Sequence, residues 1–104
     1  MIIYNVTINV EDSIHYDWLF WIKEHIKEVL ATGKFNSAKM TKVLVEEDME
    51  GTNYSIQYTA KSKEALQAYY KEDAPKLRQK SIAKFGTKML SFRTELQIIE
   101  EFHA

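Results

Sequence analysis

Cysteine is absent from this 104-residue sequence, proline occurs once and glycine only three times. Without cysteine the chain cannot hold a disulfide, a thiolate metal site, an iron–sulfur cluster or a cysteine nucleophile. The three glycines stand far apart, so the sequence has no glycine-rich loop that would cradle a phosphate. These absences exclude iron–sulfur electron carriers, thiol enzymes and P-loop nucleotide-binding proteins.

A strong charge of one sign is also lacking, because 14 basic residues nearly balance 15 acidic ones. Nucleic-acid-binding proteins usually carry a basic excess, since phosphate neutralisation supplies most of their affinity. No apolar run approaches the ~20 residues of a membrane span. The start of the chain has neither the basic residues nor the long apolar core of a signal peptide. We therefore expect a cytoplasmic protein with no nucleic-acid and no membrane partner.

Hydrophobic periodicity predicts a single domain over residues 1–104. Apolar and polar residues alternate in four predicted strands, at 1–10, 35–46, 52–60 and 88–99. Apolar residues recur at helical spacing in two predicted helices, at about 12–30 and 62–86. The order strand, helix, strand, strand, helix, strand is typical of an α+β ferredoxin-like βαββαβ sandwich, a four-stranded antiparallel sheet with two helices on one face.

Local signals predict where these elements begin and turn. Asp12 or Ser13 is the expected cap of the first helix, and Ser62 is the expected cap of the second. Pro75 should interrupt the second helix, with Asp73 available as a new cap. A hairpin turn is expected at residues 48–51.

Strand alternation also predicts what each sheet face carries. In the first and third strands Tyr4, Tyr54 and Tyr58 share the phase of aliphatic residues and should face the helices. An open face without aromatics on these strands is unlike RNA-binding modules of this topology. In the last strand we expect the aliphatic and aromatic residues inward, and the polar ones outward, on an open face of mixed character. Such a face suits contact with a second sheet better than water, and so predicts a homodimer.

Polar residues of the predicted open face are candidate ligand contacts. Arg93 and Glu95 lie two residues apart on one strand, so both side chains should leave the same face. Beside Asn5 or Gln57, the guanidinium of Arg93 would accept an anionic group of a small molecule. The alternative is an ion pair between Arg93 and Glu95 at a dimer interface.

Four residues of the first predicted helix have two readings each. Trp18 and Trp21 are core residues by their spacing, yet they could also wall an apolar cavity. His25 lies on the same stripe and is either a hydrogen-bonded structural histidine or a proton-transfer group. Phe20 projects from the polar side, which indicates contact with a partner or a second copy, unless it is a scattered surface residue.

No metal or cofactor is expected. His15 and His25 lie ten residues apart in one predicted helix. The helical rise separates them by about 15 Å, so they cannot ligate one ion. Glu100, Glu101 and His103 form a charged terminal tail rather than a metal site.

Several stretches carry a family resemblance: MIIYNVTINV, WLFWIKEHI with TGKF after it, NYSIQY, APKLR and SFRTEL. On these the chain resembles a family of short bacterial proteins known only as a domain of unknown function, from which no activity can be transferred. At fold level it looks like the dimeric α+β barrels, in which two ferredoxin-like sheets pack open face to open face. That superfamily includes cofactor-free monooxygenases, but no catalytic set of such an enzyme is matched here.

Three functions stay open, and whether the chain is an enzyme is undecided. The first is a homodimeric small-molecule-binding protein with polar contacts from Asn5, Gln57 and Arg93 and an apolar wall from Trp18, Trp21 and His25. The second is a cofactor-free, monooxygenase-like enzyme of the barrel superfamily that uses His25 or Arg93. The third is a protein-interaction module whose partner binds around Phe20. The ligand, reaction and pathway are not specified by these residues.

Overall fold

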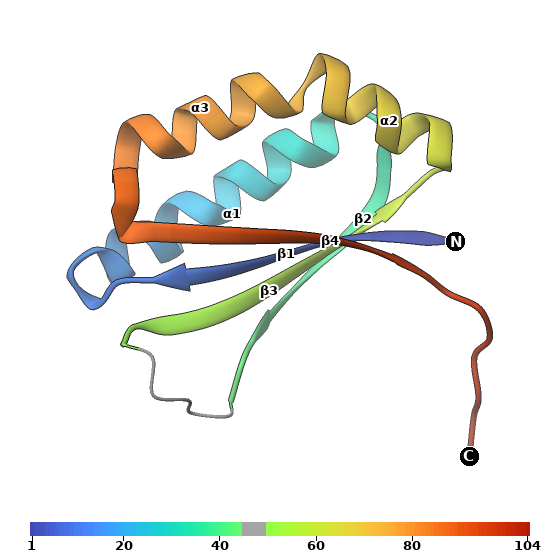
Figure 1. Ribbon diagram of the computed structural model, residues 1–104, viewed down its shortest axis with the longest axis horizontal. Coiled ribbons are helices and arrows are strands. Elements are labelled where there is room, and N and C mark those ends of the chain that lie inside the picture. The colour runs from blue at the N-terminus through green and yellow to red at the C-terminus, as the bar shows by residue number, and fades with distance from the viewer. Residues whose placement is uncertain (45–49) are drawn as a thin grey trace.

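The computed structural model describes residues 1–44 and 50–104 of the chain (Figure 1). Its elements, in chain order, are β1 (Ile2–Val10), α1 (His15–Ala31), β2 (Phe35–Lys42), β3 (Thr52–Ala60), α2 (Lys63–Glu72), α3 (Ala74–Phe85) and β4 (Met89–Gln97). Short 3-10 turns, η1 (Asp12–Ile14) and η2 (Gly86–Lys88), precede α1 and β4. This confirms the predicted βαββαβ order, with the second predicted helix divided into α2 and α3.

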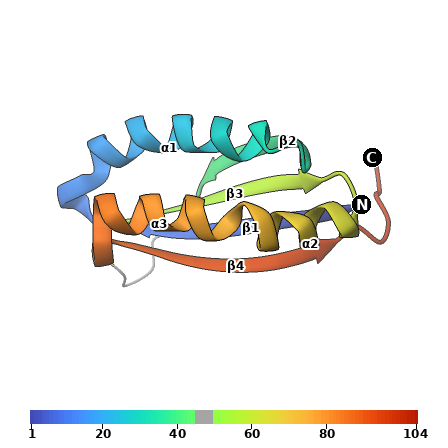
Figure 2. The same cartoon turned by 90° about the horizontal axis from the view of Figure 1, so that it is seen from above.

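The strands form one antiparallel sheet in the order β2-β3-β1-β4, so β1 and β3 are central as predicted. All the helices lie on one side of this sheet (Figure 1). Seen from above, α1 runs beside β2 and β3, whereas α2 and α3 run over β1 and β4 (Figure 2). No described helix covers the opposite side, which we call the open face.

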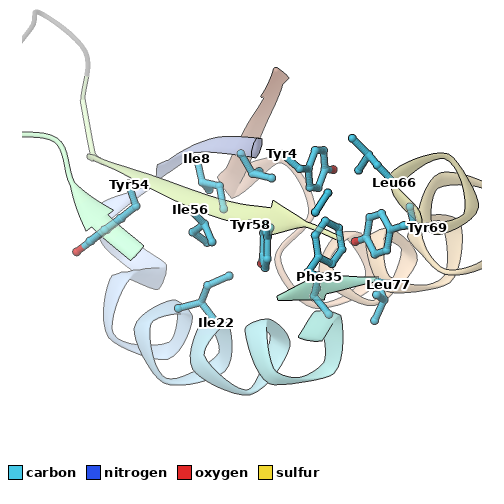
Figure 3. Close-up of a cluster of buried hydrophobic side chains, with 14 of the residues drawn as sticks. Tyr4, Ile8, Ile22, Phe35, Tyr54, Ile56, Tyr58, Leu66, Tyr69 and Leu77 are labelled. Carbon is cyan, nitrogen blue, oxygen red and sulfur yellow. The ribbon is translucent and has the colours of Figure 1, made fainter. Parts of the chain in front are cut away.

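The core lies between the sheet and the helices, and it is unusually aromatic (Figure 3). Tyr4, Tyr54 and Tyr58 point inward from β1 and β3, which confirms their predicted phase. The ring of Tyr4 packs 5.9 Å from Tyr58 and 6.1 Å from Phe35, measured between centroids. Each such pair stabilises the fold by roughly 0.5–1.5 kcal/mol beyond its buried area. Trp18 is fully buried, with 0% of its surface exposed.

Helix starts follow the predicted signals only in part. Ser62 caps α2 as predicted, since its Oγ accepts a hydrogen bond of 2.9 Å from the backbone N–H of Ala65. The predicted cap of the first helix was wrong: Asp12 and Ser13 lie in η1, and Ser13 Oγ donates to Glu11 Oε1 instead. Asp73 precedes α3 but makes no side-chain cap bond, because its carboxylate pairs with Lys34 at 3.2 Å.

The second strand is shorter than predicted. It ends at Lys42 rather than at Glu46, and residues 45–49 lie outside the described residues. The predicted turn at 48–51 therefore falls largely outside them as well. Gly51, which is described, has a φ of 87°, and a Cβ there would lie 2.5 Å from the carbonyl oxygen of Val10. Glycine is required here because any side chain would collide with the backbone of β1.

The facing of the last strand differs from the prediction. Pairing with β1 sets Arg93 opposite Val6 and Glu95 opposite Tyr4. Both side chains therefore project from the sheet on the side that the helices cover. The other set, Leu90, Phe92 and Leu96, lies opposite Asn9, Thr7 and Ile3 on the open face. The predicted assignment of the two faces of β4 was wrong. Both faces of this strand carry some apolar residues, and a shift of one residue in phase moves every side chain to the opposite face of the sheet.

Candidate functional site

A small cavity lies between α1, α3 and the inner face of the sheet. Its volume is about 30 Å³, which holds one or two water molecules. The apolar part of its wall comes from every layer of the core and consists of Val6, Ile8, Trp21, Ile22, Val29, Ile56, Leu77 and Met89. The polar part consists of Tyr4, His25, Tyr58, Tyr69, Arg78, Ser81, Ser91 and Arg93. The cavity thus combines an apolar wall with a concentrated set of hydrogen-bonding groups.

The cavity leads into a larger groove between α3 and β4. This groove has a volume of about 220 Å³. Five residues line both spaces: Arg78, Ser81, Met89, Ser91 and Arg93. The remaining wall of the groove comes from Ile82, Gly86 and Leu90. The two arginines therefore stand at the junction between a narrow interior and a wider, partly apolar entrance.

Arg78 enters this junction from α3. One of its terminal nitrogens, Nη2, donates a 3.1 Å hydrogen bond to the hydroxyl of Tyr4. Its Nε is buried and finds no hydrogen-bond partner among the described residues. The Ser81 hydroxyl, one turn further on, donates its hydrogen bond to the backbone carbonyl oxygen of Arg78 at 2.8 Å. Arg78 thus retains an unused, desolvated donor beside the cavity.

Arg93 enters the same junction from β4, because its pairing with Val6 turns it toward the helices. Neither Arg78 nor Arg93 forms an ion pair with a carboxylate of residues 1–44 or 50–104. The carboxylate of Glu28, which acts on His25, is itself paired with Lys80 at 2.9 Å. Two guanidinium groups therefore line one small site without an ion-pair partner among the described residues.

His25 lies at the opposite wall, on α1. Its ring stacks on Trp21 with centroids 4.6 Å apart, and Trp21 meets Phe85 edge-on at 5.2 Å. Burial lowers the pKa of His25 below its ordinary value, Glu28 opposes this, and the charges of Lys80 and Arg93 lower the pKa further. The imidazole is consequently neutral near pH 7 and can accept or donate one hydrogen bond.

The phenols beside the arginines are also kept in their neutral form. Burial raises the pKa of both Tyr58 and Tyr69 far above the usual value for tyrosine. Burial, with help from the charge of Glu95, raises the pKa of Tyr70 to about 12. These hydroxyl groups are therefore hydrogen-bond donors at neutral pH, so they add donors and no negative charge to the arginine side of the core.

The predicted site residues lie in four different places. Arg93, His25 and Trp21 line the cavity together. Asn5 and Gln57 lie opposite each other on the open face, on the far side of the sheet from it. Trp18 is buried in the core, where its indole N–H donates to the sulfur of Met89 at 3.1 Å, and it does not line the cavity. Glu95 lies on the inner face near Tyr70.

Arg78, Ser81 and Ser91 complete the cavity and were not predicted from the sequence. Ser81 belongs to the buried stripe of α3, with Ala74, Leu77 and Phe85, and Arg78 flanks this stripe. A serine within an apolar stripe, with an arginine three residues before it, is a signal that the sequence did contain. Ser91 could not be placed, because it shares the phase of Arg93 that was assigned to the wrong face.

Phe20 lies outside the cavity and is 84% exposed. It borders a separate depression of about 610 Å³ lined by Ile14, Asp17, Phe20, Trp21, Glu24, Lys84 and Phe85. Tyr16, 87% exposed on the same helix, is a second aromatic surface residue that the sequence analysis did not single out. Trp21 lines both this depression and the cavity.

The open face has a polar centre and an apolar margin. Asn5 donates from Nδ2 to the hydroxyls of Thr7 and Thr94 at 3.3 and 3.2 Å, and accepts from Ser55 at 2.7 Å. Asn9 donates to Asn53 Oδ1 at 3.0 Å. The edge strand β4 adds three exposed apolar side chains: Leu90, Phe92 and Leu96. Asn5, Thr7, Ser55 and Thr94 thus form a hydrogen-bonded cluster at the centre of this face.

Neither a metal site nor a membrane span is seen in the part of the chain that the structure describes. Within residues 1–44 and 50–104, no three His, Cys, Asp or Glu side chains gather closely enough to hold a metal ion. None of the described helices combines the length and apolar character needed to cross a bilayer.

Solved structures with the same fold are numerous but distant in sequence. An ethyl tert-butyl ether d (ethd) family protein of Bacillus halodurans superposes with a TM-score of 0.66 at 18% identity, covering 95% of this chain and 100% of the other. A candidate antibiotic biosynthesis monooxygenase of Deinococcus radiodurans gives 0.60 at 12% identity, over 100% and 98% of the two chains. A dimeric ferredoxin-like protein of unknown function from Thermobifida fusca gives 0.55 at 13% identity, over 92% of each chain. At these identities the likeness shows the fold alone.

The sequence of the chain matches a protein family but no curated protein. No curated protein of known role matches the chain in sequence. The model of one family, described as a domain of unknown function (DUF4286), matches residues 1–99 and so spans nearly the whole chain. The ferredoxin-like sandwich described above is thus the fold of a member of that family, and this chain belongs to DUF4286.

Proposed function

We propose that this chain forms a homodimer through its open sheet faces and binds a small molecule in the cavity beneath α1 and α3. The observation that carries the proposal is the junction of cavity and groove, where Arg78 and Arg93 meet without a described carboxylate partner. The buried Nε of Arg78 has no hydrogen-bond partner among the described residues, and leaving a desolvated donor unpaired costs free energy. An occupied binding site would explain why these groups are retained.

Exposed apolar side chains support the dimer. Phe92 is 62% exposed, and with Leu90 and Leu96 it forms an apolar margin along β4. The C-terminal segment after β4 leaves on the open side of the sheet (Figure 1) and carries exposed Ile99 and Phe102. Apolar area of this kind is characteristic of interaction surfaces. The Thermobifida fusca protein of the same fold is described as dimeric, which makes a second copy the natural occupant.

The polar centre of the open face is compatible with burial in such a dimer. Burying an unpaired amide or hydroxyl costs about 1–3 kcal/mol, but Asn5, Ser55 and Thr94 already bond to one another. Asn9 donates to Asn53 in a second bonded pair. The bonds already formed within the face lower the cost of covering these groups with a second sheet, while Phe92 and its neighbours supply the apolar contact.

Light scattering and native mass spectrometry on the same purified sample test both parts of the proposal. We expect a solution mass of two chains and, under native conditions, a dimer that carries additional small mass. Denaturing the sample should release that mass as an identifiable compound. A monomer with no bound compound would contradict the proposal, because both the sheet interface and the ligand would then be missing.

A cofactor-free enzyme is the second candidate, and one observation favours it. His25 is a neutral imidazole on the cavity wall, where it would accept a proton from a bound substrate. The Deinococcus radiodurans protein of the same fold is described as a candidate monooxygenase, which suggests electron-rich phenols or hydroquinones as trial substrates.

Oxygen uptake with such substrates distinguishes the enzyme from a binding protein. The native chain should consume oxygen, and His25→Gln should abolish uptake while the circular dichroism spectrum is unchanged. If neither protein consumes oxygen but both bind the same compound, binding is the function and His25 is part of the wall.

A further inference from the structure

Resting on the proposed ligand-binding role, we infer that the ligand carries an oxyanion, a carboxylate or phosphate group, joined to a small apolar body. The oxyanion lies between Arg78 and Arg93 at the junction of cavity and groove, and the apolar body lies along the groove between α3 and β4. This assigns the class of ligand and its orientation.

The hydrogen-bond donors of Arg78 and Arg93 favour an oxyanion. Arginine offers several donors in a flat fork that matches an oxyanion with two parallel hydrogen bonds. Nη2 of Arg78 donates to the Tyr4 hydroxyl, while its buried Nε has no hydrogen-bond partner among the described residues. Arg93 approaches from the opposite wall and has no described carboxylate partner. The remaining donors of Arg78 and the guanidinium of Arg93 line one space and form a site for negative charge.

The surrounding groups strengthen this preference for an anion. The Glu28 carboxylate is paired with Lys80, and burial, which raises the pKa of Tyr58 and Tyr69, keeps these two phenols neutral. His25 across the cavity is uncharged but can donate one hydrogen bond. Glu95 is a carboxylate near these arginines: it acts on Tyr70 and lies opposite Tyr4, two positions along β4 from Arg93. The local balance is therefore positive.

The sizes of the two spaces orient the ligand. The inner cavity of about 30 Å³ admits a group no larger than one or two waters, such as an oxyanion oxygen. The groove of about 220 Å³ is the space large enough for a ring or a branched chain. Beyond the arginines its wall has apolar side chains from Ile82, Met89 and Leu90, with Ser81 and Ser91 on the side shared with the cavity. The anionic end consequently points inward and the apolar body outward.

Titration calorimetry with three probes of one shape tests the inference. Phenylacetate and phenyl phosphate carry the two kinds of oxyanion, and phenylacetamide is the neutral counterpart of phenylacetate. We expect at least one anionic probe to bind about tenfold or more tightly than phenylacetamide, which is the range for charge-assisted hydrogen bonds. The stronger of the two anions identifies the oxyanion. Binding of both anions no tighter than that of phenylacetamide, or no binding of either anion at millimolar concentration, would overturn it.

Two arginine variants and one control locate the effect. Arg93→Gln and Arg78→Gln should each weaken the anionic probe about tenfold and leave phenylacetamide unchanged. Lys76→Gln removes the same charge from an exposed position on α3 outside both spaces, and should change neither affinity. Equal losses in Lys76→Gln and Arg93→Gln would mean that net charge alone attracts the probe. Arg93→Gln, whose side chain is exposed, keeps the test valid if Arg78→Gln unfolds.

The outcome is separable from that of the proposed function. If native mass spectrometry finds a neutral compound whose retention is unaffected by Arg93→Gln, the protein binds a ligand but the oxyanion inference is wrong. If the anionic probe binds a monomer in an arginine-dependent manner, the oxyanion site stands and the proposed dimer is wrong.

Discussion

The two faces of the central strands β1 and β3 differ in chemical character, although alternate residues of the same strands form them. The inner face presents tyrosines and aliphatic residues that the helices cover, with Tyr4 at the centre of an aromatic cluster. The open face presents asparagine, serine and threonine that bond to one another, with Asn5 at the centre. Folding buries the first face, and we propose that association buries the second.

The edge strand β4 reverses this division of character. Its inner side carries Ser91, Arg93 and Glu95, whereas its open side carries Leu90, Phe92 and Leu96. Charged side chains can reach solvent from the edge of a sheet while the rest of the strand is packed. The strand at the edge thus places polar chemistry next to the cavity and apolar area on the proposed interface.

The largest expected effect separates the two faces within β3. Ile56→Ala removes a side chain that is 1% exposed and leaves a void among well-packed neighbours. We expect the free energy of unfolding to fall by about 2–5 kcal/mol. Gln57→Ala, one residue further along and on the open face, should change it by less than about 1 kcal/mol. Urea denaturation measures both, and similar losses would contradict the contrast between buried and open faces.

The second prediction concerns the open face alone. Phe92→Lys places a charge at the centre of the apolar margin, and we expect it to weaken the homodimer by about 2 kcal/mol or more, roughly 30-fold in dissociation constant. Because the Phe92 side chain is largely exposed in the single chain, the fold should persist. Analytical ultracentrifugation gives the dissociation constant, and circular dichroism checks the fold.

Phe20→Ser is the matched control for this variant. It alters an equally prominent exposed aromatic, but one that lies on α1, on the helical side of the molecule. We expect the dimer to persist in Phe20→Ser. If Phe20→Ser dissociates while Phe92→Lys stays dimeric, the interface lies on the helices and Phe20 is part of it.

The contrast between strands also explains what the sequence could predict. In β1 and β3 one phase is aliphatic or aromatic and the other is polar, so Tyr4, Tyr54 and Tyr58 were placed correctly. In β4 the more apolar phase was taken as the buried one. That rule fails at a sheet edge, where Phe92 is exposed and Arg93 lines the cavity.

The candidate site was predictable only where a local pattern marks it. His25 and Trp21 share a helical stripe, which is a property of one element, and the cavity does bring them together. Arg78 meets Arg93 only because α3 packs over β4, and no local pattern encodes that pairing. Asn5 and Gln57 were grouped with Arg93 through the mistaken phase of β4, and they lie on the other side of the sheet.

A third prediction probes the inner face through its phenols. Burial and then the charge of Glu95 raise the pKa of Tyr70 to about 12, from 10.0 in the unfolded chain. A raised pKa means that the unfolded chain loses its proton first, so stability is constant below about pH 10 and decreases as the pH rises toward 12. Urea denaturation across this range should show the loss, and Tyr70→Phe should reduce it. An identical pH profile in Tyr70→Phe would assign the loss to other groups, such as lysines.

The smallest expected effect comes from His25 at the cavity wall. Burial lowers its pKa below 6.5, with Lys80 and Arg93 adding to this and Glu28 opposing it. Because the unfolded chain then takes up a proton first, the stability present above pH 6.5 is lost as the pH falls through the lowered pKa. His25→Gln should flatten this part of the stability profile, and NMR titration of the imidazole gives the pKa directly. Addition of the anionic probe should raise it, since a bound negative charge favours the imidazolium. A titration at or above 6.5 in the free protein would show that the cavity is open to water, and the inner and open faces would then differ less than their packing indicates.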